Sequence, residues 1–380
     1  MKLSKINDYL HEKFSEFTNK NFIEDFNPYQ IISKKKGLLY YKCSHKFKNS
    51  KIGTTEYQSL GIARAMNKAG YVVTVVDRKV KFKILNKYDL FVGAFNTGGF
   101  KYFDHILNQL SKNTIKIGLS TGANPNLMKK EFEKRKRMFL RRNKIKLNHM
   151  TRYSLVDFKK FRKKLDYLIY FGYKKGFVDK SYNFKKKIDI QSCISDKIKF
   201  KKKIFRASLL KNFIYYSGSG FLHKGLDLVI EFFIKNPNLR LCICSASHEK
   251  KFLEFYNLKN YKNISFFGDV KEESKKAKQL FNRCGFIISM NCSGGASAAL
   301  AVGRRYGLIP VIFKNEDCNP KSCFFVKNEN FKEMEKTINK ATKLNKTEYI
   351  KLSAENQMIS KENTSKFYNR KLNKIFNKIN

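Results

Sequence analysis

The stretch FIYYSGSGFLHKGLDLVIEFF, residues 213–233, contains the pattern that most clearly indicates the fold. An apolar run rich in aromatic and β-branched residues is followed by a turn of small residues and then by a run with helical character. A second stretch, GFIISMNCSGGASAALAVGRRYGLIPVI, residues 285–312, has the same order and ends in another strand-like run. Strands that alternate with helices through short glycine-bearing loops specify a parallel sheet with right-handed crossovers. We therefore predict an α/β domain in this half of the chain.

The same alternation occupies the first half of the chain. Its strand-like runs are GLLYYK (37–42), YVVTVVD (71–77), YDLFVGA (88–94), TIKIGLS (114–120) and DYLIYFG (166–172). The strongly basic stretch 195–212 lacks a clear apolar period, and we place a domain junction there. The sequence thus predicts two Rossmann-like parallel-sheet domains facing a cleft, over residues 1–203 and 204–360. A C-terminal helical tail, residues 361–380, is expected to pack back on the first domain.

The amino-acid composition indicates the general class of protein but not its function. A chain of 380 residues with 42% hydrophobic content can fill two cores. The net charge of +48 favours nucleic acid or an anionic membrane as a partner, but an AT-rich coding sequence would also enrich lysine. The eight cysteines form no disulfide framework, and no apolar run approaches the roughly 18 residues needed to span a bilayer. We expect a cytoplasmic protein, soluble or held at the inner face of the membrane.

The turn SGSGFLHKG is a candidate phosphate site. The small residues Gly218, Ser219 and Gly220 would let backbone N–H groups approach an anion at the N-terminus of the following helix. Lys224 would add a full positive charge, and His223 beside it could also touch phosphate. A tight strand-to-helix turn with a solvated lysine explains the same residues without a ligand.

A second candidate loop precedes the helix of small residues near position 300. Its Gly294 and Gly295 would expose backbone N–H groups, and Ser293 and Ser297 would offer hydroxyls to a sugar or a phosphate. Ala296 completes this loop. Close packing of an Ala-rich helix on the sheet explains the alanines that follow, but it does not explain the run of Ser and Gly.

In this order, the two stretches and the intervening NISFFGDV (263–270) resemble the donor domain of the group 1 (family 4) glycosyltransferases of the GT-B fold. The resemblance covers residues 213–312, and residues 53–76 resemble the first loop, helix and strand of that superfamily. It implies a nucleotide-sugar-dependent, hexosyltransferase-like enzyme with a first domain for the acceptor and a second for the donor. The implied donor is a UDP- or GDP-sugar, used with retention of configuration, without a bound metal or a permanently bound cofactor.

The resemblance also implies roles for individual residues. Lys224 matches the lysine that neutralises the donor diphosphate, and Gly53, Thr54 and Thr55 match the first loop. In that loop Glu56 is a candidate for orienting an acceptor hydroxyl, although a carboxylate in the first turn of a helix is favoured by the helix dipole in any case. Thr121 lies in the loop that often carries a catalytic histidine in the family, and is the other catalytic candidate.

Three features depart from the family pattern. Ser219 or Gly220 stands where an arginine is usual, and the loop at 120–124 has no histidine. The acidic pair of the donor loop is missing, with Gly294 at the first position and Val302 or Gly303 at the second. Each lost carboxylate removes charge-assisted hydrogen bonds worth about 1.5–3 kcal/mol. The alternative function is therefore a catalytically silent GT-B-like binding or scaffold subunit.

A strongly basic helix is expected from Lys129 to Lys146, and Met128, Phe132 and Phe139 could share one of its faces. Such a helix suits an anionic membrane surface or a phosphate-bearing acceptor, and it could equally be a solvated surface helix. No nucleic-acid recognition module accompanies the charge, so no specific nucleic-acid partner is expected. The leading prediction is a transferase in polysaccharide biosynthesis, acting on a cell-surface glycan or a lipid-linked acceptor.

Overall fold

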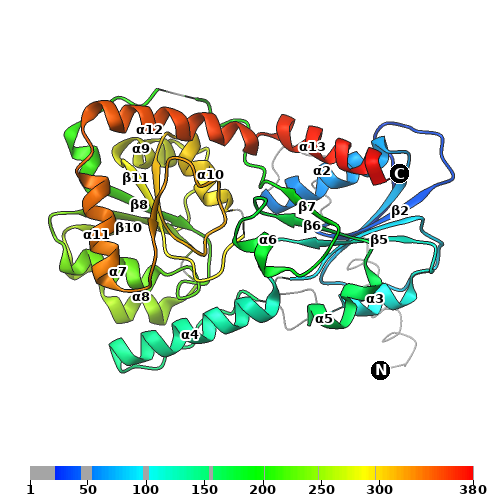
Figure 1. The fold of residues 1–380 in the computed structure, drawn as a ribbon, viewed down its shortest axis with the longest axis horizontal. Helices are drawn as coiled ribbons and strands as arrows, with labels where there is room; N and C mark the ends of the chain where they lie inside the picture. Colours follow the sequence, from blue (N-terminus) through cyan, green and yellow to red (C-terminus); the bar gives the residue numbers. More distant parts are fainter. Residues whose placement is uncertain are drawn as a thin grey trace, which may run out of the picture.

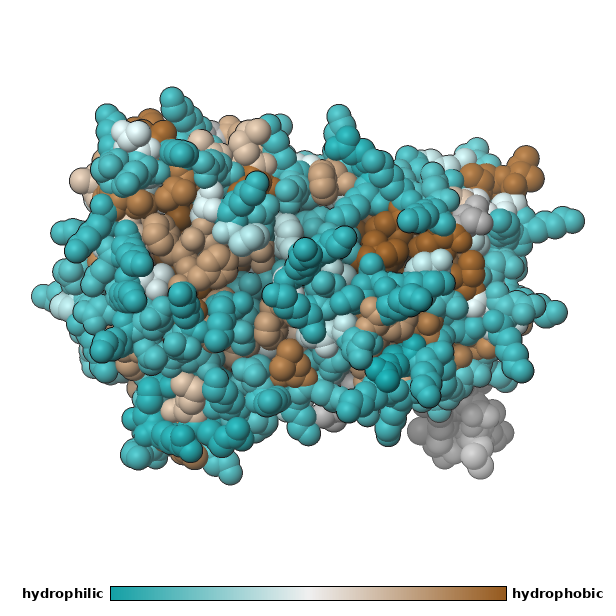
Figure 2. Space-filling view, viewed as in Figure 1, coloured by the Kyte–Doolittle hydropathy of each residue, from teal (hydrophilic) through white to brown (hydrophobic). Residues whose placement is uncertain are grey.

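The computed structural model describes residues 22–43, 54–96, 102–153, 157–200, 202–246, 248–295 and 297–379. Two β-sheets lie side by side along the long axis of the molecule, each with helices on its faces (Figure 1). Hydrophilic side chains cover most of the face seen in Figure 2, in keeping with the high net charge.

The first sheet has seven strands in the order β1-β3-β2-β4-β5-β6-β7. All neighbours are parallel except β1 and β3, which pair antiparallel with a register shift. The strands are β1 (Phe22–Phe26), β2 (Lys36–Tyr41), β3 (Val72–Asp77), β4 (Leu90–Ala94), β5 (Ile115–Ser120), β6 (Tyr167–Phe171) and β7 (Lys187–Ile190). Its helices are α2 (Thr54–Lys68), α3 (Phe103–Gln109), α4 (Pro125–Asn143), α5 (Phe158–Phe161) and α6 (Phe177–Ser181). A short 3-10 helix, Arg162–Lys164, follows α5.

The central strands of this sheet are buried on both faces. Leu39 and Val75 belong to one apolar cluster, and Leu38 and Val76 belong to another. Successive side chains of a strand point to opposite faces, so a strand that is covered on both sides must be apolar throughout. This explains why YVVTVVD is apolar through its length.

The second sheet has six parallel strands in the order β10-β9-β8-β11-β12-β13. They are β8 (Asn212–Ser217), β9 (Arg240–Ser245), β10 (Ile264–Phe266), β11 (Phe286–Ser289), β12 (Ile309–Phe313) and β13 (Phe324–Val326). The helices are α7 (Leu226–Lys235), α8 (Lys250–Tyr256), α9 (Lys275–Arg283), α10 (Ala298–Arg305), α11 (Phe331–Thr342), α12 (Lys346–Ile359) and α13 (Ser365–Ile379). Three further 3-10 helices are Ala207–Lys211, Leu258–Asn260 and Ser360–Asn363.

The predicted fold class of two Rossmann-like sheets with a C-terminal helical tail is confirmed. The sequence did not reveal β1, which lies in a stretch with the composition of a polar segment. Its first and last residues, Phe22 and Phe26, are half-buried, and it forms an edge strand. An edge strand has one neighbour, so it needs less apolar character than a central strand.

Two long elements cross from one sheet to the other (Figure 1). After α12 has packed on the second sheet, α13 lies along α2 of the first, where Tyr368 donates a hydrogen bond from its hydroxyl to the carbonyl of Gln58 (3.0 Å). In the opposite direction, α4 leaves the first sheet, and Phe132 and Phe139 join the apolar core beneath β8 and α7. Both crossings hold the carboxyl ends of the two sheets against each other.

Candidate functional site

The turn after β8 is built as an anion-binding turn, but a side chain already occupies part of it. Gly220 has a φ of +88°, a conformation that glycine adopts without strain. The backbone N–H groups of Gly220 and Phe221 donate to Oε1 of Glu249 at 2.8 and 2.7 Å. These two N–H groups are therefore satisfied by a carboxylate of the protein itself. A ligand phosphate would have to be held mainly by side-chain cations, or it would have to displace Glu249.

Helix α7 begins at Leu226, and Gly225, with a φ of +73°, is its N-cap residue. Lys224 therefore lies directly before the N-terminus of this helix. Its side chain is half-buried rather than exposed, as a lysine in an open cleft would be. Burial lowers the pKa of Lys224, whereas the charge of Glu316 raises it. Among the described residues, its ammonium group makes neither a hydrogen bond nor an ion pair. A partly desolvated cation without a partner is the arrangement that an anionic ligand would stabilise.

His223 is buried in the protein, although its position beside Lys224 suggested that it could contact a phosphate. Its ring is buried, its Nε2 lies 3.3 Å from the carbonyl oxygen of Ser293 and 3.4 Å from the Ser293 hydroxyl, and it packs on the ring of Phe132. Burial, and next the charge of Lys224, lowers its pKa well below the usual value. The imidazole is therefore uncharged, and it links the turn after β8 to the loop after β11.

The loop after β11 runs between the two domains. Ser293 is buried, and the N–H of Gly294 donates to the carbonyl of Asn315 at 3.2 Å. A Cβ atom added at Gly295 would lie 2.6 Å from the carbonyl oxygen of Thr121, so this glycine is needed for close approach of the two domains. Ser297 caps α10 by accepting a hydrogen bond from the N–H of Leu300 (3.4 Å). The predicted Ala296 lies outside the described residues.

Glu316, in the loop after β12, is a second carboxylate beside these loops, in addition to Glu249. It is 4% exposed, and one of its oxygens, Oε2, accepts a hydrogen bond from the Ser289 hydroxyl at 3.1 Å. Burial raises its pKa, whereas Lys224 lowers it. The other oxygen, Oε1, has no hydrogen-bond partner in the described structure. The loop after β12 therefore brings a buried acid to the base of the loop after β11, and its charge interacts with that of Lys224.

The candidate residues of the first domain are only partly brought to this place. The carbonyl oxygen of Thr121 lies close to Gly295. The N–H and the hydroxyl of Thr121 both donate hydrogen bonds to Oδ1 of Asn96, at 2.8 and 3.2 Å. Thr54, Thr55 and Glu56 form the half-buried first turn of α2, and no contact described in the structure joins them to the loops of the second sheet.

Gly53, the first residue of that predicted loop, falls outside the described residues. Glu56 therefore has no observed link to the donor loops, and its place in the first turn of a helix accounts for its position.

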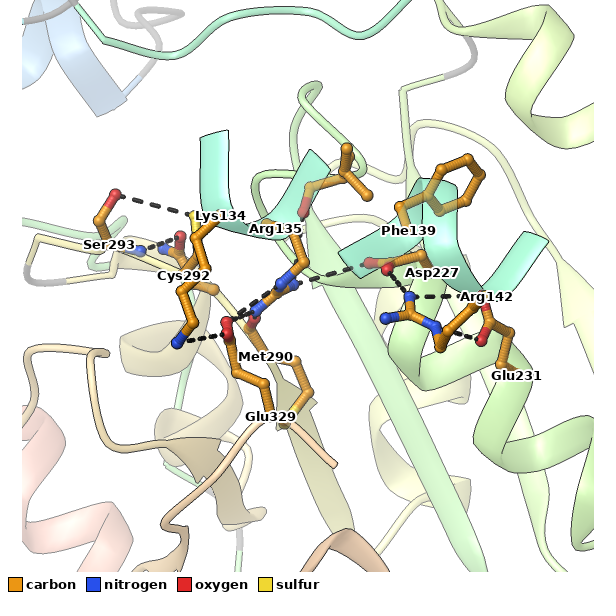
Figure 3. Close-up of polar contacts among 12 residues, drawn as sticks. Lys134, Arg135, Phe139, Arg142, Asp227, Glu231, Met290, Cys292, Ser293 and Glu329 are labelled. Carbon is orange, nitrogen blue, oxygen red and sulfur yellow. Dashed lines mark hydrogen bonds and ion pairs between the residues drawn. The ribbon is translucent and has the colours of Figure 1, made fainter. Parts of the chain in front are cut away.

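The basic helix is embedded in the second domain rather than solvated. Arg135 of α4 is fully buried, and Figure 3 shows it between Asp227 of α7 and Glu329 of the loop before α11. Its guanidinium binds Oε1 of Glu329 at 2.5 Å and donates to the carbonyl of Met290 at 2.9 Å. Arg142 also pairs with Asp227. The sequence predicted the apolar stripe of this helix but not the buried arginine that accompanies it.

Two cavities among the described residues lie away from the residues of the predicted site. One, of about 310 Å³, is lined by β13 and α11, and the other, of about 200 Å³, lies between α4, α6 and the loops after β12 and β13. No group of His, Cys, Asp or Glu in the described part of the chain could hold a metal ion. None of the helices described is long and apolar enough to cross a membrane.

Comparisons with known proteins identify the fold. No family model and no curated protein matches the sequence. Among solved structures, the sucrose-phosphate synthase of Thermosynechococcus elongatus matches with a TM-score of 0.61 and 8% identity, over 91% of this chain and 99% of that one. HepE of Anabaena, crystallised with UDP and glucose, matches with a TM-score of 0.55 and 10% identity, over 90% and 99%.

The GtfA/B complex matches with a TM-score of 0.52 and 11% identity over 77% of this chain. The present chain spans only 58% of the length of that matched chain. At such identities the likeness establishes architecture alone. The chain has the GT-B fold.

The sequence analysis did not predict two charged residues that lie beside the candidate site, Glu316 and Arg152. Glu316 stands three residues after β12, at the carboxyl end of a parallel strand, where a ligand site is expected, and this position was a usable signal. Arg152 lies in the segment between α4 and α5, and its side chain packs over Gly220. No local pattern marks Arg152, because its neighbour is far away in the sequence.

Proposed function

We propose that this protein transfers a sugar from a nucleotide-sugar donor, a UDP- or GDP-sugar, to a glycan or a lipid-linked acceptor. The observation that carries the proposal is that Lys224 and Glu316, on loops at the carboxyl ends of β8 and β12, are close enough for each charge to shift the other's pKa. Neither the ammonium group nor Oε1 of the carboxylate has a hydrogen-bond partner among the described residues. A diphosphate would satisfy the cation, and a sugar hydroxyl would satisfy the acid.

The fold is consistent with this assignment. In open α/β sheets, ligands bind outside the carboxyl ends of the strands, where these two loops lie. HepE of Anabaena has the same fold and was crystallised with UDP and glucose. Retention of configuration, without a metal ion, is the stereochemical course that we propose.

A second candidate function is a GT-B-like binding subunit without catalysis. It is favoured by Gly294 and Gly303, which lie where the resembled family has its acidic pair. A Cβ atom added at Gly303 would lie 2.8 Å from the side chain of Ile287, so no acid could occupy that position without rearrangement of α10 on the sheet.

Calorimetric titration with UDP, GDP, CMP and dTDP sugars, followed by chromatography for nucleotide release, tests both candidates. The proposal predicts saturable binding of one donor class with slow hydrolysis to the free nucleoside diphosphate. Binding without hydrolysis or transfer would favour the binding subunit. Absence of binding across the whole panel would contradict both functions.

A further inference from the structure

Two glycines of the site, Gly220 and Gly294, have neighbouring charged side chains in the space that their own side chains would fill. A Cβ atom added at Gly220 would lie 2.6 Å from Cγ and 2.8 Å from Cδ of Arg152. A Cβ atom added at Gly294 would lie 3.2 Å from both Cδ and Oε2 of Glu316. At both glycines, therefore, a charged side chain from another segment lies close to the loop: Arg152 beside Gly220 and Glu316 beside Gly294.

The signs of these charges match those that the loops lack. The turn after β8 has no arginine, and Arg152 brings a guanidinium to it. The loop after β11 has no acid, and Glu316 brings a carboxylate to it. The charge of Glu316 raises the pKa of Lys224 and the charge of Arg152 lowers it, so all three charges interact.

Arg152 belongs to a segment that contacts the second domain, where the N–H of Met150 donates to Oε2 of Glu249 (3.4 Å) and His149 packs on Phe252. It follows α4, whose Arg135 and Arg142 both bind Asp227 of α7. The guanidinium of Arg152 itself makes no hydrogen bond or ion pair to any described residue, and burial lowers its pKa, as does the charge of Arg78. Two cations, Arg152 and Lys224, thus gather at this place without a direct partner. The charge of Glu249, which binds the N–H groups of Gly220 and Phe221, raises the pKa of Arg152, and the charge of Glu316 raises that of Lys224, so carboxylates of the protein offset part of this positive charge. An anion bound beside both cations would be stabilised by each of them.

The usual backbone ligands of a phosphate are not available in this turn. The N–H groups of Gly220 and Phe221 already donate to Glu249, so side chains must provide most of the stabilisation of a diphosphate. An arginine fork can donate two parallel hydrogen bonds to phosphate oxygens, which a lysine cannot do. Arg152 and Lys224 are therefore complementary as ligands.

We propose that Arg152 and Glu316 complete the donor site, with Arg152 binding the diphosphate beside Lys224 and Glu316 accepting a hydrogen bond from a hydroxyl of the donor sugar. This inference rests on the proposed function. It adds that one diphosphate ligand comes from the segment between α4 and α5, outside the donor domain, and that the sugar is held by an acid of the loop after β12.

The two residues have separable signatures in calorimetric titrations of the full-length protein. Arg152→Ala should weaken binding of both the nucleotide sugar and the free nucleoside diphosphate by about 10- to 150-fold. Glu316→Gln should weaken binding of the nucleotide sugar relative to the free diphosphate by a similar factor, and the loss of a negative charge near Lys224 should not lower the affinity for the free diphosphate. Arg152→Lys, which keeps the charge but not the fork, should retain part of the affinity.

Matched controls are Arg141→Ala, an exposed arginine of α4, and Glu335→Gln, an exposed acid of α11, and neither should alter binding. Returning the positive charge to the turn after β8 is the stronger test. Ser219→Arg should recover diphosphate affinity in an Arg152→Ala background. Far-UV circular dichroism and the unfolding midpoint verify that each variant is folded.

The outcomes separate this inference from the proposed function. If the parent protein binds a nucleotide sugar and Arg152→Ala or Arg152→Lys binds it equally well, Arg152 is not a ligand. If Glu316→Gln leaves the preference for the sugar over the free diphosphate unchanged, Glu316 does not contact the sugar. If the parent protein binds no nucleotide and no nucleotide sugar, the proposed function and this inference are both overturned.

Discussion

Lys224 is the residue at which the sequence pattern and the geometry of the structure agree best. A helix N-terminus supplies only about half a unit of positive charge, and the nearby N–H groups of Gly220 and Phe221 already bind Glu249. The ammonium group must therefore provide much of the attraction for a diphosphate. It is half-buried, so its charge is less screened by water than that of a surface lysine.

Lys224→Ala should weaken nucleotide-sugar binding by about 1.5–3 kcal/mol, the range for hydrogen bonds to charged groups. Lys224→Arg should restore only part of the loss, because a planar fork does not reproduce a point charge on a short turn. Titration calorimetry with the donor and with the free nucleoside diphosphate measures both effects, and the exposed Lys259→Ala serves as the control. Equal affinities for the parent and Lys224→Ala would place the diphosphate elsewhere.

Residues of the site differ in how well the sequence could reveal them. Lys224 and Ser297 each follow a strand within one β-α unit, so local order in the sequence was enough to propose them as site residues. The neutral state of His223 depends on burial against Phe132 of α4, and the position of Arg152 depends on Gly220. Both contacts join segments that are distant in the sequence, and no local pattern encodes them.

At the level of elements, α4 differs most from its expected role. The periodicity of Phe132 and Phe139 correctly indicated an amphipathic helix, but the apolar face packs on the second domain and is not available to lipid. Arg135 lies on this buried face, and its partner Glu329 is 194 residues away in the sequence. A basic residue inside an apolar stripe cannot be assigned to the core from periodicity alone, because the compensating acids come from other elements.

Arg135→Ala should destabilise the protein by about 3–5 kcal/mol, since it leaves Asp227 and Glu329 buried with less compensating charge. The exposed Arg137→Ala on the same helix should change stability by no more than about 0.5 kcal/mol. Urea unfolding followed by circular dichroism compares the three proteins. A loss below about 1 kcal/mol in Arg135→Ala would show that the acids are satisfied without the arginine.

The outward face of α4 supports a separate prediction about membranes. The exposed residues Lys129, Lys130, Arg137 and Arg141 leave a positive surface, each basic group being worth about 1 kcal/mol near an anionic bilayer. Because the apolar side chains are buried in the protein, any association should rely on charge. Sedimentation with anionic vesicles should fall sharply as salt rises and be absent with neutral vesicles. Binding insensitive to both salt and lipid charge would refute this mechanism.

At the scale of the whole molecule, the two sheets are linked by elements that run between them. Asp317, from the loop after β12, accepts hydrogen bonds from the N–H groups of Tyr173 (3.1 Å) and Val178 (2.8 Å) in the first domain. The close approach of Gly295 to Thr121 adds a second contact. The alternation of strands and helices predicted both sheets, but the cleft expected between them is filled at these points. Which loops meet depends on how the domains dock, and that docking has no local signature.

The C-terminal helix α13 is the other link, and the close packing of α13 on α2 argues that it stabilises the first domain. A Cβ atom added at Gly61 of α2 would lie 2.7 Å from the ring of Tyr368, so the two helices approach each other closely. Leu372 and Phe376 are buried in the same core as β2 and β3, whereas Phe367 of the same helix is only half-buried.

Leu372→Ala should therefore cost about 2–5 kcal/mol, the range for removing a buried leucine side chain, because the cavity would lie between α13 and the sheet. Lys374→Ala, exposed on the same helix, should be neutral within about 0.5 kcal/mol. Truncation after Lys361 should lower stability further, since it also removes Tyr368 and Phe376. Hydrogen exchange in α2 and the midpoint of urea unfolding report on this contact. If the truncated protein unfolded at the same urea concentration as the full chain, with α2 equally protected, α13 would be an extension that contributes nothing to the first domain.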